Sequence, residues 1–305
     1  MIPVIVVEGP TASGKTALGV QLAKAAGGEV VSADSMQIYQ FMEIGSAAPT
    51  AAEMQGVPHH LIGVIPPVQD FSLAQYAALA REKIADIHSR GKIPVLVGGT
   101  GLYIDTVLKN ITLSETNQDP RLRERLKRLA QAEGAEALFA RLRQVDPDSA
   151  ARLHPNDLKR VIRALELYET TGETMTEHIR RSRRAPSPYR AVQFGIWYER
   201  EELYRRINQR VDNMLDQGLV EEVRRLVHMG CTRQNTSMQG IGYKEVLDFL
   251  EGKCTYPEMT EKIKMESRRY AKRQLSWFRR SPIHWLAPGE TVQIWDYLNE
   301  SGETT

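Results

Sequence analysis

Hydrophobic and polar positions in the first third of the chain follow an order typical of strand–helix–strand units. The apolar run 4–7 is followed by an amphipathic segment over 14–26, which Gly27-Gly28 ends. Residues 29–33 then form a second apolar run, of a length that suits a buried strand. Strands that alternate with helices in this way favour a parallel sheet. The pattern therefore predicts an α/β core that begins at the N-terminus.

Further periodic segments extend this core. Apolar residues recur at helical spacing over 71–90, and residues 93–97 read as another strand. The apolar run 61–65 is also expected to form a strand, directly after His59 and His60. Because adjacent side chains on a strand point to opposite faces, we expect structural roles for both histidines rather than a shared metal.

Helical patterns replace this alternation from about residue 113 onward. The segment between 113 and 190 carries capping signals such as Asp119-Pro120 and Asp146-Pro147, and it ends in a basic, proline-bearing linker at 180–188. A returning strand is expected over 192–198. Further helices are expected at 200–217, 220–229, 243–250 and 257–280. We therefore expect a helical domain of residues 114–190, inserted into an α/β core of residues 1–113 and 191–305 with a helical C-terminal region.

Composition limits the classes of protein to which this chain can belong. The 305 residues are 42% hydrophobic and 26% charged, with a formal net charge of +2, which is ordinary for a folded, soluble protein. No apolar run approaches the roughly 18 residues that a membrane span needs, and the N-terminus enters a strand directly, so we expect a cytoplasmic protein without a signal peptide. Cys231 and Cys254 lack C-x-x-C spacing, which favours free thiols over a zinc site or a disulfide.

The most specific motif lies between the first strand and the first helix. Residues 9–16 match the phosphate-binding loop G-x-x-x-x-G-K-T. In such a loop the backbone N–H groups and the helix N-terminus attract an anion, the lysine adds charge at the terminal phosphate, and the threonine hydroxyl suits Mg²⁺. The motif therefore predicts a P-loop NTPase-like core that binds a di- or triphosphate through Gly9, Thr11, Ala12, Ser13, Gly14, Lys15 and Thr16.

An absent carboxylate separates this chain from nucleotide hydrolases. Those enzymes place an Asp or Glu at the end of a second apolar strand to hold magnesium or water. Here the strand at 93–97 runs into the glycine-rich turn 98–101, and the run 61–65 ends in Pro66-Pro67. The sequence therefore weakens the ATPase hypothesis and leaves room for diphosphate as a leaving group.

Two polar side chains are expected at the same edge of the sheet as the phosphate-binding loop. Asp34 follows the strand at 29–33, and Thr100 lies in the turn after the strand at 93–97. Ligands of open parallel sheets bind at the carboxyl ends of the strands. Because Asp is also a favoured helix N-cap, a capping role for Asp34 is the alternative to the catalytic role that its position favours.

Basic residues outnumber acidic ones in two stretches, 158–190 and 258–280. Either cluster alone is explained by a solvated helix face. The second stretch also carries Tyr270, Trp277 and Phe278 among its basic residues, which suits base stacking and phosphate contacts in RNA binding but equally suits packing in a core.

Eight motifs in order along nearly the whole chain resemble the tRNA dimethylallyltransferase family. They are the phosphate-binding loop 9–16, residues 32–39 (Ser-Ala-Asp-Ser-Met-Gln-Ile-Tyr), 98–103 (Gly-Gly-Thr-Gly-Leu-Tyr), 154–157 (His-Pro-Asn-Asp), Arg160 with residues 163–166, 210–215, 240–244 (Gly-Ile-Gly-Tyr-Lys) and Lys272-Arg273-Gln274 with Trp277. Each motif alone is weak, but together they are highly specific.

The resemblance implies transfer of a dimethylallyl group from its diphosphate to N6 of adenosine 37, beside the tRNA anticodon, by a monomer of the bacterial form. The residues 11–16 would then bind the diphosphate, with Mg²⁺ near Thr16. Asp34 would accept the N6 proton, Thr100 would orient the adenine and the Asp34 carboxylate, and Arg210 would add positive charge at the diphosphate. The positions that match tRNA contacts of the family are Asp34, Ser35, Met36, Gln37, Thr100, Arg123, Lys159, Arg160, Val161, Ile162, Arg163, Gln239, Gly240, Ile241, Gly242, Tyr243 and Lys244.

One departure from the family pattern is visible, since Ala48 stands where the family usually has lysine. Its loss could weaken a contact with tRNA or phosphate, but it removes none of the residues assigned to chemistry. Three other functions stay open at this point. They are a prenyltransferase that acts on free AMP or ADP, a small-molecule kinase, and a protein that only binds its ligand.

Overall fold

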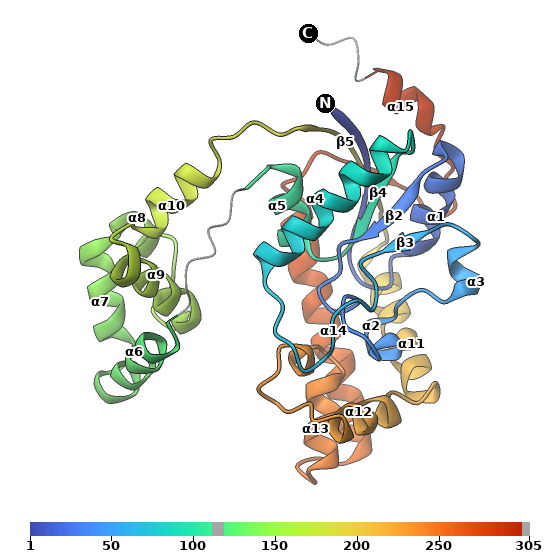
Figure 1. Ribbon diagram of the computed structural model, residues 1–305. Helices are drawn as coiled ribbons and strands as arrows, with labels where there is room; N and C mark the ends of the chain where they lie inside the picture. The colour runs from blue at the N-terminus through green and yellow to red at the C-terminus, as the bar shows by residue number, and fades with distance from the viewer. Residues whose placement is uncertain (112–118, 301–305) are drawn as a thin grey trace. The chain divides into compact units, whose positions relative to one another are not determined.

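The computed structural model describes residues 1–111 and 119–300, and the chain divides into two compact units (Figure 1). The larger unit comprises Met1–Leu108 and Ser187–Thr305, and the smaller unit comprises Lys109–Pro186. The expected start of the inserted domain, residue 114, lies outside the described residues. Its expected end, residue 190, falls inside a strand that begins at Tyr189.

The larger unit is built on a six-stranded parallel sheet in the order β3-β2-β4-β1-β5-β6. The strands are β1 (Ile2–Glu8), β2 (Glu29–Ser32), β3 (His59–His60), β4 (Pro94–Gly98), β5 (Tyr189–Ile196) and β6 (Ile283–Leu286). The predicted α/β class with a parallel core is therefore confirmed. Strand β6 was not predicted.

The predicted strand at 61–65 is wrong. Strand β3 consists of His59 and His60, which pair with Val30 and Val31 of β2. Leu61 has a left-handed backbone (φ 63°), which L-residues adopt mainly in turns, so the strand cannot continue through it. His60 Nε2 contacts the buried Glu29 carboxylate at 2.7 Å, and His59 Nδ1 contacts the Val57 carbonyl at 2.8 Å. Both histidines have structural partners.

Alternate residues of β1 belong to two different apolar clusters. Val4 and Val6 pack in one cluster, and Ile5 and Val7 pack in the other. Both faces of a parallel sheet are normally covered, and the helices follow this rule. The first cluster includes residues of α4 (Leu73–Ser89), α5 (Gly101–Leu108) and α14 (Tyr256–Phe278), and the second includes residues of α1 (Lys15–Ala26) and α15 (Ile294–Glu300).

The C-terminal helices lie within a few residues of the predicted ranges. They are α11 (Arg200–Asp216), α12 (Leu219–His228), α13 (Tyr243–Leu250) and α14, with a 3₁₀ turn, η1 (Ser237–Gln239), before α13. Two short helices, α2 (Glu43–Ser46) and α3 (Ala51–Met54), occupy the loop after β2. Cys231 and Cys254 are free thiols. Within the described ranges, no helix has the length and apolar character that a membrane crossing requires.

The smaller unit is helical and has its own core. Its helices are α6 (Pro120–Glu133), α7 (Ala135–Val145), α8 (Pro147–Ala150), α9 (Leu158–Thr171) and α10 (Met175–Ser182). Leu126, Leu138, Leu142 and Val161 are fully buried in it. Helix α10 was not predicted, and it contains the first three residues of the expected linker. A capping box of Thr174 and Glu177 starts this helix, so a local signal for it was present in the sequence.

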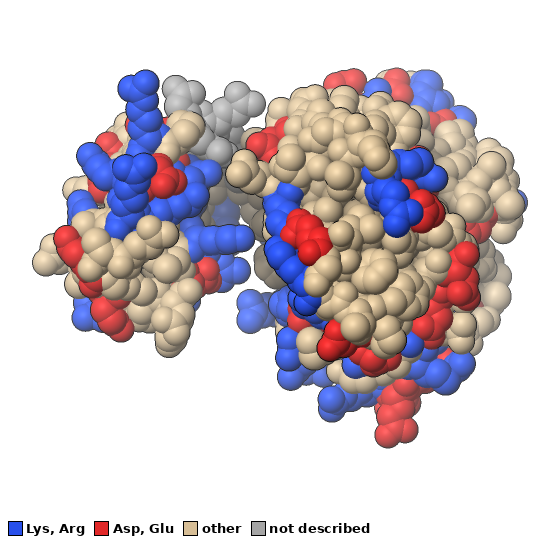
Figure 2. Space-filling model, turned by 90° about the horizontal axis from the view of Figure 1, so that it is seen from below, with Lys and Arg blue, Asp and Glu red and all other residues tan. Residues whose placement is uncertain are grey.

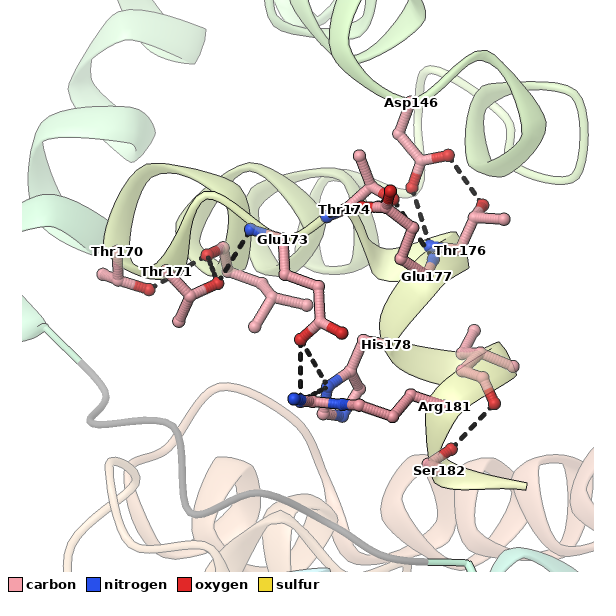
Figure 3. A network of polar contacts seen from close by, with 12 residues as sticks. Asp146, Thr170, Thr171, Glu173, Thr174, Thr176, Glu177, His178, Arg181 and Ser182 are labelled. Carbon is pink, nitrogen blue, oxygen red and sulfur yellow. Dashed lines mark hydrogen bonds and ion pairs between the residues drawn. The ribbon is translucent and has the colours of Figure 1, made fainter. Parts of the chain in front are cut away.

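Asp146 joins three helices of this unit. It follows α7 and accepts a hydrogen bond from the Ser149 N–H of α8 at 3.0 Å. It also accepts from the Thr176 N–H of α10 at 3.0 Å and from the Thr176 hydroxyl at 2.6 Å (Figure 3). Asp146 is 3% exposed, and a buried carboxylate requires such partners. Asp146, which was expected to cap α8, therefore also fixes the start of α10.

Candidate active site

A cavity of about 340 Å³ opens in the larger unit at the carboxyl ends of β1, β2 and β4. Its polar lining includes residues from the phosphate-binding loop and from the segments 34–37 and 239–244. Its apolar lining residues are Val97, Ile207, Val211, Met214, Ile241 and Ile263. Lys15 and Thr16, Asp34, and Arg210 come from three separate segments of the sequence and line this one cavity.

The phosphate-binding loop connects β1 to α1 with an unusual backbone. Gly14 has φ 87° and begins α1, and Ala12 has φ 63°. The left-handed region costs an alanine roughly 1 kcal/mol, so the surrounding structure must hold Ala12 in place. The Arg206 Nε donates a hydrogen bond to the Ala12 carbonyl at 3.0 Å, and its guanidinium lies 4.7 Å from the centre of the Tyr198 ring.

Lys15 and Arg210 bring two positive charges into the cavity. The Lys15 Nζ donates to the Pro10 carbonyl at 3.0 Å, and Arg210 Nη2 donates to the Ser46 carbonyl at 3.4 Å. Burial and then the nearby Arg210 lower the pKa of Lys15 to about 8, although Asp34 acts in the opposite direction. Burial also lowers the pKa of Arg210. Across residues 1–111 and 119–300 neither cation has an ion-pair partner, so the site is suited to a multiply charged anion.

Asp34 follows β2 and lines the cavity. Its Oδ1 accepts a hydrogen bond from the Met36 N–H at 2.9 Å. No helix begins at this point in the chain, so the helix N-cap alternative is wrong and the contact closes a turn instead. Among the residues that the structure describes, none donates a hydrogen bond to Oδ2. This oxygen is therefore available to a ligand in the cavity.

Thr100 holds the residue after Asp34. Its hydroxyl accepts a hydrogen bond from the Ser35 N–H at 3.1 Å and lies 3.4 Å from the Ser35 hydroxyl. It also contacts the Tyr270 hydroxyl, whose pKa burial raises to about 12. In the described part of the chain Thr100 makes no hydrogen bond to Asp34 itself. Its effect on the carboxylate therefore passes through the backbone of the turn.

Most of the expected tRNA-contacting residues of the larger unit share this cavity. Ser35, Met36, Gln37, Gln239, Gly240, Ile241 and Lys244 line it, together with Asp34. Tyr243 does not, because it is 0% exposed and its hydroxyl donates to Glu222 Oε1 at 2.8 Å. Gly242 (φ 97°) begins α13. The structure thus brings together segments 34–37 and 239–244, with Tyr243 directed inward.

Glu222 and Tyr243 support one wall of the cavity, and sequence reasoning missed this role. The buried Glu222 carboxylate accepts from the N–H groups of Ile44 at 2.7 Å and Gly45 at 3.0 Å. A Cβ atom at Gly45 would lie 2.4 Å from the Tyr243 ring, so only glycine fits there. The wall supplies the carbonyl that Arg210 contacts. Glu222 lies on the apolar face of α12, with Leu219 and Val223. A charged residue at such a position could have indicated a buried structural role from the sequence.

The expected tRNA-contacting residues of the smaller unit differ in exposure. Val161 and Ile162 belong to its apolar core. Arg123 and Arg163 donate to Glu166 Oε2 at 2.8 and 3.0 Å, and Glu166 is 0% exposed.

Lys159 and Arg160 are exposed at the start of α9, where Arg160 lies 3.2 Å from Asp157. Figure 2 shows that Lys and Arg side chains gather on one face of this unit. The side chains of this stretch that can meet a polyanion are therefore Lys159 and Arg160, with Arg123 and Arg163 partly committed to Glu166.

Comparison with known proteins gives consistent matches over the chain. A family model described as IPP transferase matches residues 37–281, and one described as isopentenyl transferase matches residues 2–63. The chain is 50% identical over 293 residues to a tRNA dimethylallyltransferase of Bacillus velezensis, covering 96% of this chain and 93% of that protein. It is also 50% identical to the Bacillus subtilis protein of the same name, covering 91% of this chain and 88% of that protein.

Solved structures agree with these matches. The tRNA isopentenylpyrophosphate transferase of Bacillus halodurans has a TM-score of 0.71 and 42% identity, covering 99% of this chain and 95% of that chain. A eukaryotic dimethylallyltransferase described as acting on tRNA has a TM-score of 0.80 and 30% identity, covering 99% of this chain and 77% of that chain.

Proposed function

Because this chain belongs to the IPP transferase family, we propose that it transfers a dimethylallyl group from dimethylallyl diphosphate to N6 of adenosine 37 in tRNA. It is a prenyltransferase, and tRNA is its acceptor. We propose further that it works as a monomer in the cytoplasm. The observation that carries the proposal is the shared cavity, in which Lys15 and Arg210 lack ion-pair partners and Asp34 presents an oxygen without a donor among the described residues.

The charged and the apolar residues that line the cavity suit the two parts of a prenyl diphosphate. Lys15, Arg210 and the start of α1 form a site for the diphosphate. The six apolar residues that line the cavity can exclude water from a five-carbon chain, at about 25 cal/mol per Å² of buried surface. A dry environment also protects an allylic carbon that gains positive charge from attack by water.

Mg²⁺ fits the side chains that are present. Thr16 lines the cavity beside Lys15, while no group of three or more His, Cys, Asp or Glu residues suited to a metal occurs within residues 1–111 and 119–300. Mg²⁺ commonly takes few protein ligands and keeps substrate phosphate oxygens and water. We propose that the Thr16 hydroxyl and the diphosphate would hold it. Its chemistry there would be neutralisation of charge on the leaving group.

Asp34 supplies the base in the proposed reaction. The amino group of adenine is a poor nucleophile because its lone pair is delocalised into the ring. As the new C–N bond forms and the allylic C–O bond breaks, Asp34 Oδ2 accepts the N6 proton, while Lys15 and Arg210 stabilise the departing diphosphate. Adenosine 37 must leave its stack in the anticodon loop to reach the cavity, which costs a few kcal/mol.

The affinity for inorganic diphosphate is expected to fall as the pH rises above about 8. Lys15, whose pKa is lowered to about 8, is protonated below this pH. Above it, the free protein loses the proton and must take it up again on binding. One linked proton weakens binding by up to about tenfold per pH unit. Calorimetry checks this, and Lys15→Gln should abolish the dependence. A constant affinity in the unmodified protein across this range would contradict the role of Lys15.

Binding of tRNA is expected to depend on salt through the exposed start of α9. Replacing Lys159 and Arg160 by glutamine should lower the log–log salt slope by about 1.5, at about 0.7–0.9 per lost phosphate contact. Arg163 is left in place because its loss would leave the buried Glu166 with fewer donors. Lys127→Gln with Arg128→Gln on α6 removes the same charge from exposed positions and serves as the control. An unchanged slope would mean that Lys159 and Arg160 are solvated surface residues that do not contact tRNA.

Comparison of acceptors tests the proposed function. Labelled dimethylallyl diphosphate is supplied with tRNA or with AMP, and labelled ATP is supplied with the same acceptors. We expect transfer of the label from dimethylallyl diphosphate to tRNA, with much less transfer to AMP. Efficient prenylation of AMP, or transfer of phosphate from ATP, would overturn the proposal.

A further inference from the structure

Gln274 of α14 connects two glycine-rich loops that are far apart in the sequence. Its Oε1 accepts a hydrogen bond from the N–H of Thr11, 263 residues away, at 2.9 Å. Its Nε2 donates to the carbonyl of Gly99 at 2.8 Å. Gln274 is 6% exposed. Its contact with Gly99 is buried and its contact with Thr11, at the edge of the cavity, is partly buried, so losing either hydrogen bond would be costly.

The turn after β4, residues 98–101, packs closely against Gln274 and Trp277 of α14. A Cβ atom at Gly99 would lie 2.3 Å from Gln274 Nε2. A Cβ atom at Gly101 would lie 2.4 Å from Cδ1 of Trp277, one helical turn further along α14. A side chain at Gly99 would therefore displace the Gln274 amide, and one at Gly101 would displace the Trp277 ring. The contact is therefore part of the packing between α14 and this turn.

A hydrogen bond connects this turn to the residue after the base. Thr100 follows Gly99, and its hydroxyl holds the N–H of Ser35, the residue after Asp34. On the other side, Thr11 belongs to the loop that carries Lys15 and Thr16. One amide side chain thus lies between the segment that binds the diphosphate and the turn that carries the base.

We propose that Gln274 is a positioning residue, which fixes the phosphate-binding loop relative to the turn that carries Asp34. This inference rests on the proposed function. The position needs a donor and an acceptor in one group, as an amide provides. Methionine has a similar length but neither capacity. A glutamate keeps the acceptor for Thr11, and it regains a donor for Gly99 only when it is protonated.

The test compares Gln274→Met and Gln274→Glu in the full chain with Gln209→Met, an exposed control on α11. We expect Gln274→Met to weaken binding of inorganic diphosphate by about tenfold, because the loop is no longer preorganised. We also expect its single-turnover transfer rate with saturating substrates to fall by about 10–100-fold, as a small misplacement of reacting groups does. The affinity for tRNA should stay within about twofold.

The pH profile separates positioning from a general loss of packing. The rate of Gln274→Glu relative to the unmodified chain should rise as the pH falls, because the protonated carboxyl can donate to Gly99 again. A flat ratio at all pH values would contradict the proposal, and so would unchanged diphosphate binding and rate in Gln274→Met. A loss confined to tRNA affinity would make Gln274 a tRNA contact instead. If the unmodified chain prenylates nothing, the proposed function fails, while diphosphate binding still tests Gln274.

Discussion

Asp34→Asn is expected to reduce the single-turnover rate of prenyl transfer by about 10²–10⁴-fold, the usual range for a positioned general base. Asparagine keeps the shape of the side chain and can still accept the hydrogen bond from the Met36 N–H. Its amide cannot accept a proton from N6 at neutral pH. The binding of both substrates should change far less, because Lys15, Arg210 and the basic surface are unchanged.

The melting temperature of Asp34→Asn provides the control. Asp34 is half-buried at the edge of the sheet and carries no ion pair in the described chain, so the variant should melt close to the unmodified protein. Single-turnover transfer at a nearly normal rate would mean that Asp34 only closes a turn. In that case the reaction would have to depend on the departure of diphosphate alone.

Lys15→Ala is expected to weaken binding of dimethylallyl diphosphate and to lower the transfer rate by about 10²–10³-fold, the cost of removing one well-placed donor to developing negative charge. The effect is large because Lys15 and Arg210 have no ion pair in the described residues and so face the leaving group together. Tight tRNA binding should persist, since other residues supply that surface. Steady-state and single-turnover kinetics measure both effects.

Lys24→Ala is the matched control for this substitution. Lys24 lies on the same helix, α1, but it is exposed and its Nζ bonds to Gln55 Oε1 at 2.8 Å. Its loss should leave transfer unchanged. Equal kinetics for Lys15→Ala and the unmodified chain would refute the use of the phosphate-binding loop for the diphosphate.

Local patterns were sufficient to predict the α/β class and the elements around the cavity. The phosphate-binding loop is one short stretch whose backbone needs glycine at Gly14, so its sequence largely determines its form. Asp34 and Thr100 could be assigned to one edge because parallel strands bring their carboxyl ends together. Helices α11 to α14 were predicted closely because apolar periodicity and capping residues mark their ends.

Contacts between distant segments could not be predicted in the same way. Gln274 reaches Thr11 only because α14 packs across the turn at Gly99, and no local pattern encodes this. Tyr243 lies in the motif 240–244, which the resemblance assigned to tRNA contact, yet its buried hydroxyl donates to Glu222 of another helix. The strand predicted at 61–65 is absent and β3 is confined to His59 and His60, because the left-handed backbone at Leu61 ends it, although the run 61–65 is apolar.

Prenyl transfer to adenosine 37 is measured by nucleoside mass spectrometry of tRNA incubated with the chain, dimethylallyl diphosphate and Mg²⁺. Ribonuclease mapping assigns the modified position. We expect one dimethylallyl group on N6 of adenosine 37 and release of diphosphate in equal amount, both formed at least about 100-fold more slowly by Asp34→Asn and Lys15→Ala. Unmodified tRNA, or prenylation at another nucleoside, would contradict this expectation.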